Sequence, residues 1–281
     1  MLALLAGGHV LLEGPPGVGK TSLAQAVAAV FQGTFRRIQM TSDLLPSDVV
    51  GSLRLRPGSN DFEFRPGPVF CHVLLADELN RTSAKTQAAL LEAMAEGRVS
   101  VDGVAHPLPV PFFVVATQNP QEFHGVYPLS ESQLDRFMLH VTLGLPNPDA
   151  ELAVYRKHGA DADSARAAPA LTLDELLAYR AEVDRVFVED SVLRYVQAIA
   201  QALRKEEDVV HAASVRAVLQ LIDCAKARAY LAGRDFVLPE DVFALAPDVL
   251  AHRLCFRAGE FSSTQRKEIV RHALERVDTP K

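Results

Sequence analysis

The segment from Gly14 to Thr21 constrains the fold more than any other part of the chain. It follows the apolar run His9–Glu13, which predicts a strand, and it precedes Ser22–Phe31, where apolar residues recur at helical spacing. Small residues between a strand and a helix let backbone N–H groups turn inward around phosphate oxygens, and the helix N-terminus adds positive partial charge. We therefore expect a phosphate-binding loop in which Lys20 neutralises the β- and γ-phosphates and the Thr21 hydroxyl ligates Mg²⁺.

Two acidic residues end the next buried strand. The run His72–Ala76 is continuously apolar, and Asp77 and Glu78 follow it directly. Ligands bind at the carboxyl ends of strands in open α/β sheets, which makes this a favourable place for a metal and a reacting water. We expect Asp77 to hold the metal through water and Glu78 to polarise the attacking water. The presence of Glu78 argues for hydrolysis rather than for nucleotide binding alone.

Two further polar residues interrupt or follow apolar segments. Asn119 comes after a third buried strand, Phe112–Thr117, and could hold the lytic water or touch the γ-phosphate. Taken alone, it is better explained as an Asn that favours the turn after the strand. Arg136 could be a surface cation that pairs with Asp135 or Glu131. It could also stabilise charge on the transferring phosphoryl group from a neighbouring subunit.

The pattern of apolar residues changes near residue 146. Before it, short apolar runs alternate with helical patterns such as Thr82–Glu96, which is typical of a parallel sheet covered by helices on both faces. After it, strand patterns nearly disappear and four helical patterns follow, at Thr172–Val186, Asp190–Arg204, Ser214–Leu231 and Glu240–Phe256. We predict an ATPase core at 1–145, a linker with a short helix and a flexible loop at 146–172, and a helical domain at 173–281.

Local signals add detail to this organisation. Asp43–Gly67 is rich in Pro, Gly, Ser and Arg, and could hold a short hairpin or helix. Arg98–Leu108 resembles a β-hairpin that turns at Asp102-Gly103. Ser214 is placed to cap the helix that follows it, and Pro239 suits the first turn of the last predicted helix.

The composition narrows the classes of partner. The formal net charge of −6 gives no bulk attraction to nucleic acid or to an anionic membrane. No apolar run approaches the roughly 20 residues of a membrane span, so we expect no membrane insertion. Cys71, Cys224 and Cys255 lie far apart and are interpreted as buried thiols of a cytoplasmic protein, not as disulfides or metal ligands.

Together, these segments resemble the AAA+ ATPases and, more closely, the MoxR family. The resemblance covers nearly the whole chain. Its most specific stretches are Gly14–Thr21, Asp77–Arg81, Lys85–Met94, Ala116–Pro120, Tyr127–Leu129, Gln133–Phe137, Gly233–Val237 and Val249–Leu254.

The resemblance assigns roles by position. Asp77 and Glu78 look like the Walker B pair, Asn119 like sensor 1, and Arg136 like the arginine finger that completes a neighbour's site. Arg216 lies in a segment that resembles the family's Gly-Ala-Ser-Pro-Arg-Ala, which makes it the sensor 2 candidate. The residues expected to act in catalysis are Glu78, Asn119, Arg136 and Arg216. The residues expected to bind ATP and Mg²⁺ are Gly14, Pro15, Pro16, Gly17, Val18, Gly19, Lys20, Thr21, Ser22 and Asp77.

The resemblance also implies a fold and a function. The fold would be α/β, a P-loop AAA+ parallel-sheet sandwich followed by a small all-helical lid domain. The function would be ATP hydrolysis by a hexameric ring that remodels or matures a protein complex or metalloenzyme, with a von Willebrand factor A domain protein as adaptor. An alternative is an AAA+ motor or regulator acting on nucleic acid, which the acidic balance disfavours. A nucleotide-gated scaffold that hardly hydrolyses ATP is a third reading, disfavoured by the intact acid pair.

The sequence departs from the family pattern in three ways. Only 13 residues precede Gly14, where AAA+ modules usually carry a further helix and an adenine-contacting segment. Ala212 and Val215 replace the family's glycine and proline near Arg216. Ala76 stands where a larger apolar residue is common.

Overall fold

The computed structural model of the chain describes residues 1–119, 126–157, 170–257 and 261–280. Contacts divide it into two compact units, neither continuous in sequence. The sheet unit contains Leu11–Pro128 and Thr142–Leu176, and the helical unit contains Met1–Val10, Leu129–Val141 and Leu177–Lys281. The predicted domain boundaries stay a prediction, and residues 158–169 of the predicted linker lie outside the described residues.

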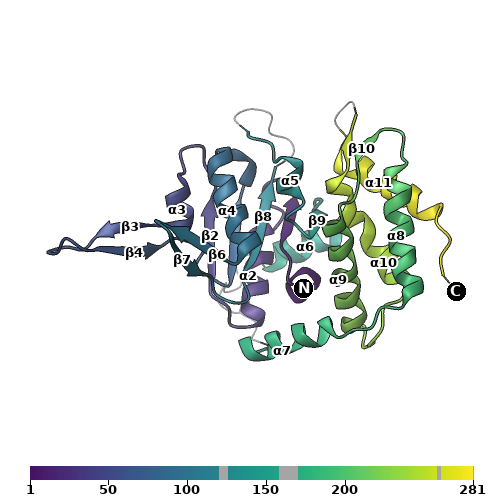
Figure 1. Cartoon of the computed structure of the whole chain (residues 1–281), viewed down its shortest axis with the longest axis horizontal. Coiled ribbons are helices and arrows are strands. Elements are labelled where there is room, and N and C mark those ends of the chain that lie inside the picture. Colours follow the sequence, from purple (N-terminus) through teal and green to yellow (C-terminus); the bar gives the residue numbers. More distant parts are fainter. Residues whose placement is uncertain (120–125, 158–169, 258–260, 281) are drawn as a thin grey trace. The chain divides into compact units, whose positions relative to one another are not determined.

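The described strands of the central sheet lie in the order β2-β5-β8-β1-β9 (Figure 1). Their bounds are Val10–Glu13 for β1, Phe35–Gln39 for β2, Val73–Asp77 for β5, Phe113–Gln118 for β8 and Leu139–Thr142 for β9. β5 pairs in parallel with both β2 and β8, and all its residues are buried. The three predicted buried strands are confirmed as β1, β5 and β8.

Helices accompany these strands in the sheet unit. They are α2 (Lys20–Val30), α3 (Pro46–Val50), the short 3₁₀ helix η1 (Leu79–Arg81), α4 (Ala84–Glu96) and α6 (Pro148–Lys157). α4 has clear boundaries: Ser83 caps it by accepting a hydrogen bond from Thr86 N, and Gly97 ends it in the left-handed conformation. The helices predicted at Ser22–Phe31 and Thr82–Glu96 are therefore confirmed, within two residues at each end.

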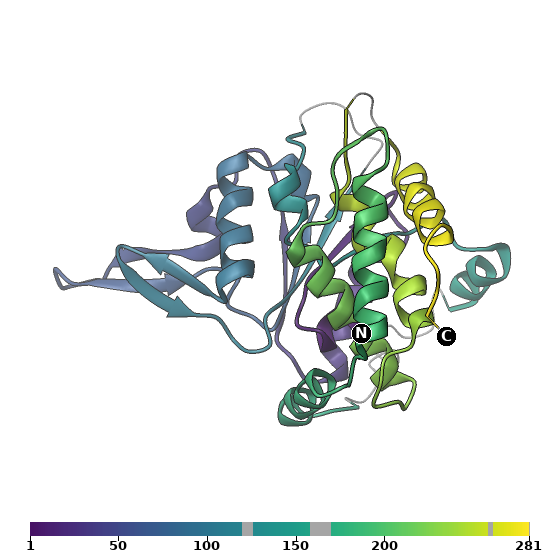
Figure 2. The same ribbon diagram turned by 45° about the vertical axis from the view of Figure 1, so that its right-hand side comes forward.

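Two antiparallel hairpins complete the sheet unit. One pairs β3 (Gly51–Leu55) with β4 (Phe62–Pro66), and the other pairs β6 (Arg98–Val101) with β7 (Val104–Pro107). Asp102 and Gly103 both have positive φ, as a two-residue type I′ turn requires. The hairpins lie side by side (Figure 2). The rings of Phe64 and His106 stack between them, with 3.9 Å between centroids. The hairpin predicted at Arg98–Leu108 is confirmed, and Asp43–Gly67 holds both a helix and a hairpin.

The helical unit contains most of the remaining elements. Its helices are α1 (Leu2–Leu5), α5 (Glu131–Leu134), α8 (Asp190–Arg204), α9 (Val215–Leu231), α10 (Pro239–Leu250), the 3₁₀ turn η3 (Ala251–Arg253) and α11 (Ser263–Glu275). α7 (Leu173–Asp184) crosses the division between the units, and β10 (Val209–His211) pairs with β11 (Cys255–Phe256). Ser214 caps α9 as predicted, accepting from Ala217 N at 3.1 Å, and Pro239 begins α10.

Three details of the helical unit differ from the sequence predictions. The helix predicted at Glu240–Phe256 ends at Leu250, because η3 turns the next residues toward carbonyl oxygens of another segment. α11 was not predicted, since it buries only Val270, Ala273 and Leu274. Cys255 is half-buried, whereas Cys71 and Cys224 are buried as expected, and all three are free thiols.

None of the helices within the described ranges combines the length and apolar character that crossing a membrane would require.

Candidate functional site

The loop between β1 and α2 has a backbone that requires glycine at three positions. Gly17 and Gly19 have φ of +84° and +89°, where a side chain would be strained. A Cβ on Gly14 would lie 2.5 Å from the carbonyl oxygen of Leu143. Glycine is thus required at two positions by the backbone conformation and at a third by close packing against Leu143.

The N-terminus of α2 is open for an anion. Its capping residue, Gly19, has no side chain that could accept from the first-turn N–H groups. Lys20 Nζ donates to Gly14 O at 2.8 Å, which places the ammonium group at the start of the loop. Thr21 is half-buried in the first turn. The first-turn N–H groups of the helix, the helix dipole and an ammonium group together favour a phosphate.

Asp77 is buried at the end of β5 and contacts side chains from both neighbouring strands. Thr117 on β8 donates its hydroxyl proton to Asp77 Oδ1 at 2.7 Å. Arg37 on β2 forms an ion pair with Asp77 Oδ2, with 2.6 Å between Nη2 and the oxygen. The carboxylate is therefore fixed in orientation by the register of three adjacent parallel strands.

Glu78 has a backbone conformation that is uncommon for its residue type. Its φ of 59° and ψ of 52° lie in the left-handed region, which costs energy for a residue with a Cβ. Thr117 Oγ1 accepts from Glu78 N at 2.8 Å, and Gln39 Nε2 donates to Glu78 Oε2 at 2.6 Å. Arg81 lies 3.2 Å from the same carboxylate. The left-handed backbone ends the strand at this position, and these contacts fix the Glu78 carboxylate.

Asn119 follows β8, the strand between β1 and β5. Gly14 N donates to Gln118 O at 3.4 Å, which joins the start of the glycine loop to the end of β8. Asn119 is itself buried, with 8% of its surface exposed. The sheet thus places the end of one strand, with Asn119, between the glycine loop and the acid pair. Pro120, which follows Asn119, lies outside the described residues.

A buried glutamine fixes the backbone just after the acid pair. Gln87 on α4 is fully buried, and its Nε2 lies within hydrogen-bond distance of the carbonyl oxygens of Leu79, Thr82 and Tyr127, at 3.2, 3.2 and 2.9 Å. These contacts hold the η1 segment in place and thereby support the conformation of Glu78.

The sequence predictions missed Arg37, Gln39, Thr117 and Gln87 as parts of this site. What these four residues share is a polar side chain on a strand of the sheet or on a buried helix face, where an apolar side chain would be expected. Arg37 and Gln39 are two residues apart on β2, so their side chains share one face of the sheet, and they face the strand that ends in the acid pair. That signal depends on knowing that β2 is next to β5, which the sequence did not show.

Arg136 and Arg216 belong to the helical unit. Arg136 is half-buried between α5 and β9, and Arg216 is exposed at the second position of α9. Asp135, one of the two carboxylates considered for Arg136, pairs with Arg253 at 3.3 Å.

The donor set of the sheet unit fits a magnesium ion. Among the described residues, no group of three or more His, Cys, Asp or Glu side chains could hold a metal. The Thr21 hydroxyl and the Asp77 carboxylate provide oxygen ligands, which Mg²⁺ prefers, and Mg²⁺ commonly binds through few protein ligands with water and phosphates completing its shell.

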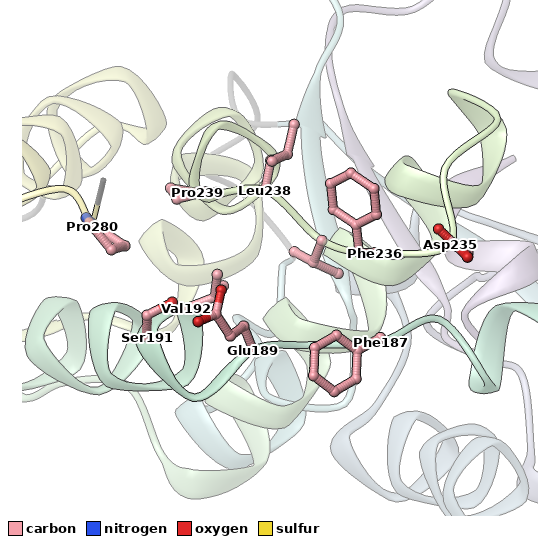
Figure 3. Close-up of a pocket in the computed structure, with 10 residues that line it drawn as sticks. Phe187, Glu189, Ser191, Val192, Asp235, Phe236, Leu238, Pro239 and Pro280 are labelled. Atoms are coloured by element: carbon pink, nitrogen blue, oxygen red, sulfur yellow. The ribbon is translucent and has the colours of Figure 1, made fainter.

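A pocket of about 450 Å³ lies in the helical unit (Figure 3). The residues that line it are distant in sequence from the glycine loop and the acid pair. Phe187, Val192, Phe236 and Leu238 give it apolar walls, and Glu189 and Asp235 contribute carboxylates. None of the described residues that line it is a lysine or arginine, so it lacks the charge that a phosphate requires. It is not a candidate for the nucleotide.

Comparisons with known proteins identify the family of the chain. Residues 9–139 match the family described as "ATPase family associated with various cellular activities (AAA)", and residues 201–273 match the "AAA lid domain". The chain is 43% identical over 281 residues to uncharacterized protein YeaC of Bacillus subtilis, covering all of this chain and 88% of the relative. It is 42% identical over 279 residues to chaperone MoxR1 of Mycobacterium tuberculosis, covering 96% of this chain and 74% of the relative.

A solved structure extends the similarity to the fold. The crystal structure of a candidate ATPase from Cytophaga hutchinsonii superposes with a TM-score of 0.90 and 35% identity, over all of this chain and 88% of that one. The glycine loop, the acid pair and the paired AAA and lid matches lead to one assignment. The chain belongs to the MoxR family of AAA+ ATPases.

Proposed function

We propose that this chain hydrolyses ATP to ADP and phosphate at the carboxyl edge of its sheet. The observation that carries the proposal is the geometry of Glu78. Its strained backbone and its hydrogen bond from Gln39 fix a carboxylate beside Asp77, with β8 lying between this acid pair and the strand that leads into the glycine loop. A protein that only bound nucleotide would have little use for a second, separately oriented acid.

Each group then has a role. The loop Gly14–Ser22 binds the phosphates through backbone N–H groups, and Lys20 neutralises their charge. Thr21 and, through water, Asp77 would hold Mg²⁺, which when bound lowers the charge on the β- and γ-phosphates. Glu78 accepts a proton from the attacking water, and Asn119 orients that water or the γ-phosphate.

The remaining roles concern assembly. We propose that the chain acts as a homo-oligomeric ring of six subunits, in which Arg136 stabilises transition-state charge at a neighbouring subunit's site and Arg216 acts as sensor 2. Hydrolysis would drive chaperone-like remodelling or maturation of a protein complex or metalloenzyme in the cytoplasm, with a von Willebrand factor A domain protein as adaptor. The chaperone name of the mycobacterial relative supports a protein client. The net charge of −6 gives no support to a nucleic-acid substrate.

Steady-state phosphate release tests the hydrolysis directly. Lys20→Ala should lose both ATP binding and turnover, whereas Glu78→Gln should lose turnover and keep ATP binding. Glu92→Gln makes the same change on an exposed face of α4 and should leave both unchanged. Turnover of the Glu78→Gln chain at the wild-type rate would remove Glu78 from the mechanism.

The client can be sought with the same variant. The Glu78→Gln chain, held in its ATP state, should retain client and adaptor proteins that the Lys20→Ala chain does not. A client retained equally by both variants would contradict ATP-dependent remodelling.

A further inference from the structure

Arg253 is an arginine buried in the helical unit, and its contacts gather on one short backbone segment. Only 5% of the residue is exposed. Its Nη2 donates to the carbonyl oxygen of Phe137 at 2.7 Å and reaches that of Asp135 at 3.5 Å. Its Nε lies 3.3 Å from the carboxylate of Asp135. The contacts therefore hold the residues on both sides of Arg136, more than 100 positions earlier in the chain.

His252 adds a second donor to the same segment. Its Nε2 lies 2.9 Å from the carbonyl oxygen of Phe137. Burial lowers the pKa of His252 well below its usual range, so the ring is neutral near pH 7. Since a neutral ring can only donate to a carbonyl through a protonated nitrogen, the proton belongs on Nε2. Phe137 is thus held through two hydrogen bonds to its carbonyl and through a fully buried ring.

The side chain of Asp135 extends these contacts to α9. Ser214 Oγ donates to the Asp135 carboxylate at 3.3 Å, and Ser214 also caps α9. Arg216, the sensor 2 candidate, follows two residues later on that helix. Gln220 on the same helix accepts a hydrogen bond from Arg253. One cluster therefore links the segment that carries Arg136 to the start of the helix that carries Arg216.

Stability alone does not account for this cluster. Burial lowers the pKa of Arg253 to about 10, which reports the cost of keeping the guanidinium group out of water. Arg253 Nη1 has no hydrogen-bond partner within the described part of the chain. Buried ion pairs of this kind are often no more stabilising than apolar residues of similar size, and their best-attested use is to specify geometry.

We infer that Arg253 is a positioning residue for Arg136: it fixes the backbone on both sides of Arg136 and joins that segment to the start of α9. The inference rests on the proposed role of Arg136 in completing a neighbouring subunit's site. Displacing a charge-stabilising group by about 1 Å can cost on the order of 10²-fold in rate. Loss of the Arg253 contacts should therefore impair the neighbour's site and leave the subunit's own ATP binding intact.

Single variants of the full chain give the first readout. Arg253→Lys keeps the positive charge, but a single ammonium group cannot replace the planar fork that reaches both Asp135 and Phe137. Its turnover should fall on the order of 10- to 100-fold with unchanged ATP affinity. His252→Ala removes the second donor to Phe137 without breaking the ion pair, and should show a smaller defect of the same kind.

Arg234→Lys is the matched control. Arg234 lies in the same unit and donates to the carbonyl oxygen of Phe236 and, through two hydrogen bonds, to the Asp241 carboxylate, not to Asp135 or Phe137. Its variant should keep wild-type turnover per folded subunit.

Mixed assemblies separate a positioning role from a merely structural one. Lys20→Ala subunits cannot bind ATP but carry an intact Arg136 segment. Mixed with Arg253→Lys or His252→Ala subunits, they should restore turnover, because each variant subunit's intact loop then meets an intact Arg136 segment. Arg136→Ala subunits mixed with Lys20→Ala subunits should be restored in the same way.

The outcomes separate two failures. If Arg136→Ala is restored by mixing but neither Arg253→Lys nor His252→Ala is, the positioning role is wrong while the proposed function stands. Wild-type turnover by the Arg253→Lys chain on its own would also overturn the positioning role of Arg253. If Arg136→Ala keeps full activity alone or is not restored by mixing, the proposed shared site fails, and the role of Arg253 falls with it.

Discussion

The acid pair in the sheet unit and the Arg136 segment in the helical unit are both held by buried polar contacts, but in different ways. Asp77 and Glu78 are held through their side chains, by Arg37, Gln39 and Thr117 on adjacent strands. The Arg136 segment is held mainly through its backbone carbonyls, by side chains at positions 252 and 253.

Because the two sites are held differently, substitutions should affect turnover and stability differently in each. Sheet register fixes the first site, and removing one contact leaves the strands in place. The second precedes β9, so Arg136 itself lies outside that strand, and its backbone is held by side chains from η3. We therefore expect changes near the acid pair to act mainly on chemistry, and changes near Asp135 to act on both chemistry and stability.

Removing the Arg136 side chain should have the largest effect. Groups of this kind are worth on the order of 10³-fold or more in the rate of phosphoryl transfer. Arg136→Ala should therefore lose turnover while ATP binding, measured with a fluorescent nucleotide, stays close to wild type. A loss of binding equal to the loss of turnover would place Arg136 in its own subunit's binding site instead.

Asp135→Asn tests the ion pair behind that segment. It leaves the buried Arg253 without its counter-charge, at a cost of about 2–3 kcal/mol, less than for a fully buried pair because Asp135 is partly exposed. Urea unfolding followed by circular dichroism measures this change. Asp248→Asn is the control: Asp248 pairs with Lys267 nearer the surface, and its loss should cost less than about 1 kcal/mol.

Thr117→Val removes one hydroxyl from the acid pair at nearly constant volume. Glu78 N and Asp77 Oδ1 both lose a partner, which typically costs about 1–3 kcal/mol. We expect turnover to fall roughly tenfold with little change in ATP affinity. Thr86→Val, which removes an equally buried hydroxyl that bonds Leu44 O, should leave the turnover of folded protein unchanged. Equal turnover in the two variants would contradict the role of Thr117.

Ser214→Ala should have the smallest effect. It tests whether the start of α9 supports Asp135, and through it turnover, in addition to stabilising the helix. It removes the cap of α9, worth about 1 kcal/mol, together with the hydrogen bond to Asp135. Ser262→Ala removes the cap of α11, where the Ser262 hydroxyl bonds Gln265 of the same helix. Both should lower stability similarly, but only Ser214→Ala should also lower turnover. Equal turnover in the two would show that Asp135 needs no support from α9.

The sequence was informative where structure is local. Unbroken apolar runs predicted β5 and β8, Asp102-Gly103 predicted a hairpin, and Ser214 predicted the start of α9. β2 was missed because two of its five residues are arginines, and at the edge of the sheet its exposed face can be charged. The continuation of α10 through Phe256 was wrong, because η3 breaks the helix to make contacts that helical periodicity does not encode.

The same contrast holds for the sites. The glycine loop and the acid pair are short motifs whose residues are neighbours in sequence, so their chemistry could be predicted. Arg253 acts on backbone carbonyl oxygens, which every residue possesses, and the nearest is 116 positions away. No pattern of residue types marks such an acceptor. Long-range contacts to backbone are for this reason visible only in the folded chain.

The nucleotide that remains bound to the Glu78→Gln chain tests hydrolysis most directly. After incubation with ATP and Mg²⁺ and rapid removal of free nucleotide, the bound species can be extracted and separated. The account predicts ADP on the wild-type chain and ATP on the Glu78→Gln chain. ADP on both, formed at the same rate, would contradict the role of Glu78 and with it the central claim.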